Sequence, residues 1–119
     1  MFEDILYETH EGIATITINR PKVRNAVRPR TYEELTEAMK TAADDPEVGV
    51  VVLTGSGDKA FSSGGDVSDQ STRKPYIGRA HMRRLFALSS TMRMMDKPII
   101  AKVRGFCVGA AMKSTCSAI

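Results

Sequence analysis

Two glycine-rich turns are the parts of this sequence best suited to chemistry. The first, Ser63-Gly64-Gly65-Asp66, closes the stretch 48–67, and the second, Gly109-Ala110-Ala111, closes the stretch 97–111. Each follows a β-branched run, where backbone N–H groups can approach a ligand without obstruction by a side chain. Two such N–H groups aimed at one point form an oxyanion hole, which stabilises charge developing on a carbonyl oxygen. Two unrelated tight turns would look the same, and the spacing alone favours that simpler interpretation.

Other ligand-binding motifs are incomplete. Gly55-Ser56-Gly57-Asp58-Lys59-Ala60 has the spacing of a dinucleotide fingerprint, but a phenylalanine and two serines follow where a helix must begin. Cys107 and Cys116 lack metal-site spacing, so we expect reduced, packed thiols and no metal site. The segment Lys22–Arg30 is rich in lysine and arginine. It is either a solvated face or a phosphate site, and residue types leave both interpretations open.

The β-rich segments predict an α/β domain around these turns. Ile5–Glu8 and Ile13–Asn19 are expected to form a hairpin with His10 in its turn. Val48–Thr54 has no polar alternation, which is typical of a strand buried on both faces. A further strand is predicted at Ile99–Val103, followed by a glycine-rich turn.

Two amphipathic segments predict helices between the strands. The first has Thr31 as N-cap, glutamates 33 and 34 in its first turn, and an end near 44–46. Because it links two strands, it predicts parallel pairing of those strands. The second helix is expected over Arg79–Met95, after a polar loop. Its apolar face is predicted to consist of Met82, Leu85, Phe86, Leu88, Met92 and Met95.

Length and composition place the chain among ordinary globular proteins. It has 119 residues, enough for one modest domain, and a net charge of +3. That charge suits an anionic ligand, but it is too weak to predict nucleic-acid binding, and no aromatic residues interleave with the basic ones. The acidic, alternating N-terminus is no signal peptide, and no apolar run approaches about 18 residues. We therefore expect a cytoplasmic protein without a membrane segment.

Four segments of the sequence resemble the crotonase (enoyl-CoA hydratase/isomerase) superfamily, in that family's order. They are NRPKVRNA at 19–26, VVVLTG at 50–55, AFSSGGD at 60–66 and KPIIAKVRGFCVG at 97–109. The Ser-Gly-Gly-Asp form and the Phe2-Glu3-Asp4 start are similar to the branch of dihydroxynaphthoyl-CoA synthase and ketocyclohexanecarboxyl-CoA hydrolase. The resemblance implies a spiral of repeated ββα units, acyl-CoA substrates, and no cofactor besides the CoA of the substrate. Residues 1–119 would form a single core, without the C-terminal helical part that builds trimers and hexamers.

The resemblance also implies roles for particular residues. The N–H groups of Gly65 and Ala110 would form the oxyanion hole for a thioester enolate. The remaining expected contacts are with CoA or the acyl chain. The loop residues Lys22, Val23, Arg24 and Ala26 would meet the adenine and phosphates, and Ser63, Gly64, Asp66, Val67 and Gly109 would line the acyl-CoA channel.

The sequence departs from the family pattern near its end. The family usually has three glycines where this chain has Gly109-Ala110-Ala111, and Lys113 stands where hydratases carry an acid/base glutamate. A second acid/base carboxylate would lie beyond Ile119. Two hypotheses remain: an acyl-CoA-processing enzyme present in truncated form, or an inactive remnant that binds CoA or assembles with a full-length relative. The departures favour the remnant, and we expect an apolar patch near 108–119 and a poor tendency to stay monomeric.

Overall fold

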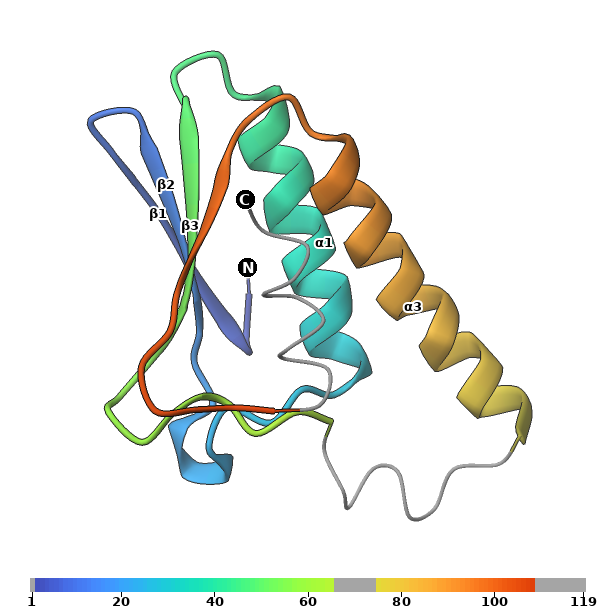
Figure 1. The fold of residues 1–119 in the computed structure, drawn as a ribbon. Coiled ribbons are helices and arrows are strands. Elements are labelled where there is room, and N and C mark those ends of the chain that lie inside the picture. Colours follow the sequence, from blue (N-terminus) through green and yellow to red (C-terminus); the bar gives the residue numbers. More distant parts are fainter. Residues whose placement is uncertain (1, 66–74, 109–119) are drawn as a thin grey trace.

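A four-stranded mixed sheet forms the centre of the molecule (Figure 1). The structure, a computed structural model, describes residues 2–65 and 75–108. The strands lie in the order β1-β2-β3-β5, with bounds Ile5–His10 for β1, Ile13–Ile18 for β2, Val50–Gly55 for β3 and Ile99–Lys102 for β5. Two helices, α1 (Pro29–Asp44) and α3 (Pro75–Met94), lie on the same side of this sheet. The predicted α/β architecture is confirmed.

The first two strands form the predicted antiparallel hairpin. His10 pairs with Ile13, so Glu11 and Gly12 make the turn. Their φ angles are 48° and 81°, the positive values that a type I′ turn requires and that match the twist of the strands. The sequence places His10 in the turn, but it is the exposed last residue of β1.

Strands β2 and β3 run parallel, as the strand–helix–strand order predicts, and β5 adds a third parallel strand beside β3. The side chains on the helix-covered face are apolar and buried: Ala14, Ile16, Ile18, Val51, Leu53 and Ile99. On the other face Val50 and Val52 are only half-buried, and Ile100 is 49% exposed. The prediction of a strand buried on both faces is therefore wrong, because both described helices cover the same face.

Helix α1 begins earlier than its sequence suggests. Arg28 is the N-cap and Pro29 is the first helical residue, a position that suits proline because the N–H there needs no partner. Thr31 is therefore not the N-cap. It lies one turn later, where its hydroxyl accepts the backbone N–H of Arg28 at 3.2 Å. The helix ends at Asp44, as predicted.

A lysine from the α3–β5 connection closes the C-terminal end of α1. Lys97 Nζ donates to the carbonyl oxygens of Ala42 at 2.7 Å and Asp45 at 2.5 Å. The last carbonyls of a helix have no intrahelical partner, and the negative end of the helix dipole lies there. The ammonium group therefore stabilises the helix end and holds the α3–β5 connection against it.

Helix α3 begins at Pro75, four residues before the predicted start at Arg79, so the polar segment before it is not entirely a loop. None of the described helices is long and apolar enough to cross a membrane.

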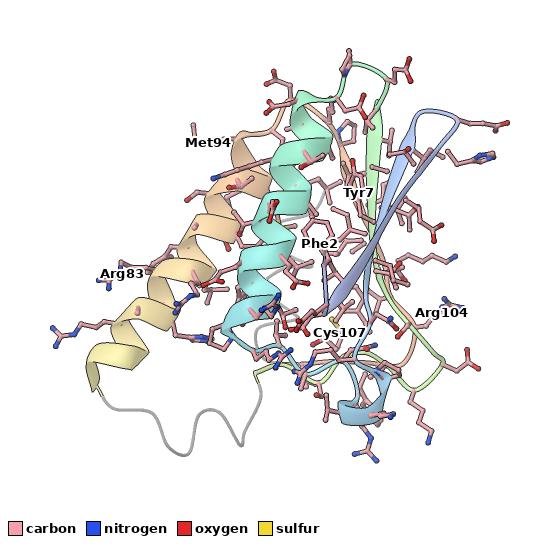
Figure 2. The ribbon with its side chains drawn as sticks, turned by 180° about the vertical axis from the view of Figure 1, so that it is seen from behind. Phe2, Tyr7, Arg83, Met94, Arg104 and Cys107 are labelled. Atoms are coloured by element: carbon pink, nitrogen blue, oxygen red, sulfur yellow. The ribbon has the colours of Figure 1, made fainter. Side chains whose placement is uncertain are left out.

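The buried face of α3 is narrower than predicted. Leu85, Leu88 and Met92 are buried, but Met82 and Phe86 are 40% and 61% exposed, so these two members of the predicted apolar face are not buried. A polar residue takes a core position instead: the ring of His81 meets that of Tyr32 edge to face, with centroids 5.0 Å apart. Arg83 and Met94 project from the outer side of the helix (Figure 2).

A second, two-stranded sheet lies across the ends of the main strands (Figure 1). It pairs β4 (Ala60–Ser62) in parallel with β6 (Phe106–Cys107). Just before β6, a Cβ on Gly105 would lie 2.2 Å from the carbonyl oxygen of Lys59, so only glycine allows this approach. The sequence predicts only a turn here and does not predict strand β6.

The thiol of Cys107 is half-buried and packs against the core, as expected. Cys116 lies outside the described residues, as does most of the predicted apolar patch at 108–119. The neighbouring side chains of Phe106 and Val108 are 66% and 46% exposed.

Candidate functional site

The glycine turn after β4 is built around one hydroxyl group. Gly64 N–H donates to Ser62 Oγ at 3.1 Å, and the Ser62 hydroxyl donates to the carbonyl of Asn25 at 2.7 Å. Gly64 has a φ of 94°, where any side chain is strained, so this position requires glycine. The next residue, Gly65, is half-exposed, and no acceptor for its N–H is found among residues 2–65 and 75–108.

A short ladder of hydrogen bonds joins this turn to the segment 24–27. Its three bonds run from Ser63 N–H to the Arg24 carbonyl (3.0 Å), from the Ser62 hydroxyl to the Asn25 carbonyl (2.7 Å) and from Val27 N–H to the Gly64 carbonyl (2.8 Å). A parallel bridge between Val27 and Gly65 continues the ladder. The loop expected to contact the CoA nucleotide and the turn expected to bind the thioester therefore lie side by side.

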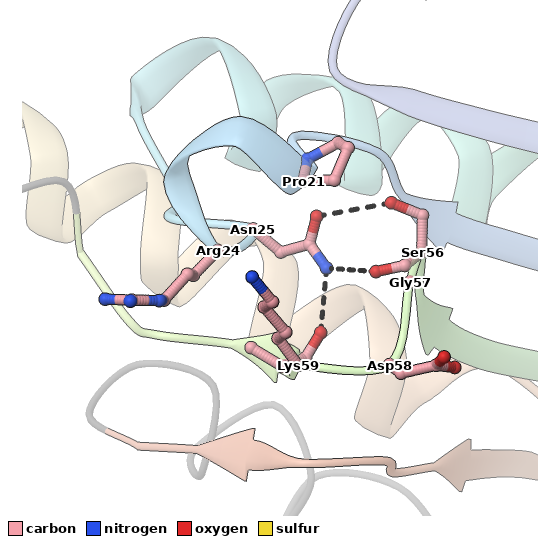
Figure 3. A pocket seen from close by; sticks show the side chains of 8 residues that line it. Pro21, Arg24, Asn25, Ser56, Gly57, Asp58 and Lys59 are labelled. Atoms are coloured by element: carbon pink, nitrogen blue, oxygen red, sulfur yellow. Dashed lines mark hydrogen bonds between the residues drawn. The ribbon is translucent and has the colours of Figure 1, made fainter.

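Asn25 holds the same region together through its side chain. It is 1% exposed and has a φ of 57°, a left-handed conformation that asparagine adopts more readily than most residues. Its Oδ1 accepts the N–H of Arg20 at 2.9 Å, and its Nδ2 donates to the carbonyls of Ser56 at 3.0 Å and Ala60 at 2.9 Å (Figure 3). One buried amide thus binds its own loop and both ends of the β3–β4 connection.

An open pocket of about 270 Å³ lies beside this amide (Figure 3). Its walls come from the loop after β2 and the β3–β4 connection, and it is lined by Pro21, Arg24, Asn25, Ser56, Gly57, Asp58, Lys59 and Ala60. The side chains of Arg24 and Lys59 extend on the same side of the pocket in this view, whereas Asp58 lies on the opposite side. The pocket is therefore lined by two cationic side chains and one carboxylate.

The second predicted glycine turn lies outside the described residues, directly after the last of them in the sequence. The last described residue, Val108, donates its N–H to the carbonyl of Ser62 at 3.3 Å. Val108, the residue before the predicted second turn, therefore lies beside the strand that leads into the first turn. Gly109 and Ala110 themselves lie outside the described residues, as do Asp66, Val67 and Lys113.

Part of the basic segment is committed to ion pairs. Arg28 Nη2 and Nε donate to the buried carboxylate of Asp4 at 2.7 and 2.8 Å, and Thr31 donates to the same group at 2.7 Å. Burial alone raises the pKa of Asp4, but these bonds and the charges of Arg28 and Arg20 outweigh it and hold the pKa below its usual value.

A second carboxylate secures the same end of α1. Glu34 is not in the first turn, as its sequence position suggested, but is buried further along the helix. It accepts the N–H of Asp4 at 2.8 Å, and Arg30 donates to it at 2.9 Å. Arg28 and Arg30 therefore attach the N-terminal strand to α1 rather than offering a phosphate site.

The other predicted contacts in the loop differ in accessibility. Lys22, Val23 and Arg24 are exposed, and no ion pair of Lys22 or Arg24 is found within the described part of the chain. Ala26 is 7% exposed, and its carbonyl accepts a hydrogen bond from Arg20, so little of it is left for a ligand to touch. Ser63 is half-buried beside Gly64.

Comparison with known proteins identifies the family to which this fold belongs. A family model for enoyl-CoA hydratase/isomerase matches residues 8–118. The chain belongs to the enoyl-CoA hydratase/isomerase family. It is 35% identical to an enoyl-CoA hydratase/isomerase from Xanthobacter autotrophicus Py2, with a TM-score of 0.92 over 99% of this chain. It is 31% identical to an enoyl-CoA hydratase/carnitine racemase from Magnetospirillum magneticum, with a TM-score of 0.94 over 99% of this chain.

The chain spans less than half the length of these enoyl-CoA hydratase/isomerase structures, about 45% in both cases. Its fold corresponds to their N-terminal part, which confirms the predicted crotonase-like architecture. Within the described residues, no group of three or more histidine, cysteine, aspartate or glutamate side chains is arranged to hold a metal ion.

Proposed function

We propose that this protein binds acyl-CoA thioesters and stabilises the negative oxygen of a thioester enolate through two backbone N–H groups, those of Gly65 and Ala110. Membership of the enoyl-CoA hydratase/isomerase family supports the substrate class. The observation that carries the site is the hydrogen bond from Val108 N–H to the Ser62 carbonyl, because it sets the approach to the second turn beside the first. The N–H of Gly65 has no acceptor within the described residues, which is what a donor reserved for a ligand requires.

The nucleotide part of CoA is assigned to the neighbouring loop. Lys22 and Arg24 are exposed cations, and Arg24 shares the open pocket with Lys59. Guanidinium and ammonium groups bind phosphate by charge-assisted hydrogen bonds. The ladder from 24–27 to 62–64 places this loop next to the glycine turn, so one ligand can contact both. In this proposal Ser63, Gly64, Asp66, Val67 and Gly109 line the channel between the two ends of the ligand.

The first experiment compares the titration of the purified chain with CoA and with a small saturated acyl-CoA. The wild-type chain is expected to bind both, and the acyl-CoA more tightly. Gly65→Pro removes the N–H and is expected to lose this preference while still binding CoA. Gly65→Ala retains the N–H, and Gly65 does not have a positive φ that alanine would strain. The alanine variant should therefore keep more of the preference for acyl-CoA than the proline variant. Circular dichroism establishes that each variant is folded.

The result that contradicts the proposal is equally specific. If the folded wild-type chain binds neither compound, its family membership records ancestry, and the chain is a non-catalytic relative.

The basic loop is tested with charge-removing variants. Arg24→Gln and Lys22→Gln are each expected to weaken CoA binding roughly two- to fivefold, as for single exposed ion pairs, without changing stability. Arg28→Gln is the matched control. It removes the partner of Asp4, so it should destabilise the fold and leave the CoA affinity of the folded fraction unchanged. If Arg28→Gln weakens binding as much as Arg24→Gln, the assignment of the nucleotide to this loop is wrong.

A further inference from the structure

One buried residue, Ser62, bonds both the first glycine turn and the residue just before the second. Ser62 is 0% exposed. Its hydroxyl oxygen accepts the N–H of Gly64 and donates to the carbonyl of Asn25, while its own carbonyl accepts the N–H of Val108. A serine hydroxyl has a single proton, so donation to Asn25 leaves its lone pairs to face Gly64. The Ser62 hydroxyl oxygen therefore fixes the direction of the Gly64 N–H.

The orientation of the next peptide unit follows from that anchor. The carbonyl of Gly64 accepts the N–H of Val27 at 2.8 Å. In a trans peptide the C=O and the following N–H point in opposite directions, so the N–H of Gly65 points away from Val27. Because Gly64 has a φ of 94° and its N–H is also held, both ends of this flexible residue are restrained. A glycine pair without such restraints would sample many orientations of the Gly65 N–H.

We propose that Ser62 is a positioning residue for the oxyanion donor of Gly65: its hydroxyl couples the glycine turn to the Asn25 carbonyl and so aims a backbone N–H at the thioester oxygen. This role rests on the proposed function. It concerns the oxygen-binding end of the ligand, because the buried Ser62 hydroxyl bonds backbone groups and not the exposed side chains of Lys22 and Arg24.

The test compares Ser62→Ala with Thr54→Val in the full chain. Both changes remove a buried hydroxyl that donates to a backbone carbonyl, but the hydroxyl of Thr54 bonds Lys102 between β3 and β5, away from the turn. The probes are CoA and acetoacetyl-CoA, a 3-oxoacyl thioester that forms an enolate without an enzymic base. The measured quantity is the ratio of the two affinities, which a general loss of stability does not change.

Ser62→Ala is expected to lower the preference for acetoacetyl-CoA over CoA roughly tenfold, since small displacements of a catalytic donor cost one to two orders of magnitude. Its affinity for CoA should stay within about twofold, and Thr54→Val should keep the wild-type ratio. A preference that Ser62→Ala retains overturns the role of Ser62 alone. A wild-type chain that binds neither probe overturns the proposed function and this role with it.

Amide hydrogen exchange tests the same role without a substitution, in case Ser62→Ala does not fold. In the unliganded wild-type chain the Gly64 amide should be protected and the Gly65 amide should exchange rapidly. Addition of acetoacetyl-CoA should then protect Gly65. Gly57, in the exposed β3–β4 turn, serves as the reference for an unprotected amide. If Gly64 exchanges as fast as Gly57, the hydroxyl does not hold the turn and the proposal fails.

Discussion

Replacing Asn25 by alanine tests whether one amide holds the candidate site together. The change removes the acceptor of the Arg20 N–H and the donors to the carbonyls of Ser56 and Ala60. Each buried group left without a partner costs about 1–3 kcal/mol, and two of the three hydrogen bonds are only partly buried, so we expect a loss of roughly 2–4 kcal/mol. Alanine at a φ of 57° adds about 1 kcal/mol of backbone strain.

The total, about 3–5 kcal/mol, is a large part of the stability of a small domain, which is typically about 5–15 kcal/mol. Urea unfolding followed by far-UV circular dichroism measures it directly. Two further variants separate the contributions. Asn25→Gly removes the amide but fits the left-handed backbone, so it should cost about 1 kcal/mol less than Asn25→Ala. Asn25→Asp places a carboxylate oxygen against the Ser56 and Ala60 carbonyls and should be the most destabilising of the three.

Ser56→Ala is the control, because its hydroxyl approaches Asn25 Oδ1 only at 3.5 Å, and it should change stability by less than about 0.5 kcal/mol. A cost below about 1 kcal/mol for Asn25→Ala would refute the reasoning, since a single buried polar group left without a partner costs at least about that much. Equal stabilities of Asn25→Gly and Asn25→Ala would refute only the estimate of backbone strain at this position.

Three further predictions concern the rest of the fold. Asp4→Asn should cost about 2 kcal/mol at neutral pH in urea unfolding; because the folded pKa of Asp4 lies below its unfolded value, the difference should persist above about pH 4 and shrink as the pH falls through the lowered pKa. Gly55→Ala should lower the free energy of unfolding more than Gly57→Ala, because a Cβ at position 55 would lie 2.2 Å from a backbone oxygen. A Cβ at position 57 meets no neighbouring atom among the described residues, so Gly57→Ala should cost only the backbone strain of about 1 kcal/mol at a φ of 78°. Phe86→Ser should leave stability within about 0.5 kcal/mol of wild type and reduce self-association in sedimentation experiments, because this ring is 61% exposed.

The elements with a clear repeat were predictable from the sequence. The hairpin and α1 follow from runs of apolar residues at strand or helix spacing, and the parallel pairing of β2 with β3 follows from the helix between them. The sequence did not predict which residues of α3 are buried. Met82 and Phe86 are apolar yet exposed, whereas the polar residue His81 is buried in contact with Tyr32. Periodicity shows that a helix has an apolar side, but the partner surface decides how wide that side is. The two-residue strand β6 is too short to produce any pattern.

The candidate site was predictable only as far as glycines and cations show it. Gly64 and the exposed Arg24 stand out by residue type. Asn25 and Ser62 do not, because their roles depend on backbone groups 31 to 37 residues away along the chain. Lys59 likewise becomes a candidate only when the fold brings it to the pocket that Arg24 lines. Buried polar residues with distant partners leave no periodic signal in the sequence. The tendency of asparagine to adopt a left-handed conformation is a weak indication of its own.

The strand pairs of this fold differ in the length of chain that must be closed before they form. The β1–β2 hairpin needs only a two-residue turn, whereas the side-chain bond between Thr54 and Lys102 across β3 and β5 spans 48 residues. Loop-closure entropy makes such long-range pairing late in folding. Strand β6 follows β5 and has only two residues, so the sheet that carries the glycine turn should assemble last and open first. A ligand that bridges the two turns would then also hold this sheet closed, and the hydrogen exchange of β6 would slow in proportion to ligand affinity.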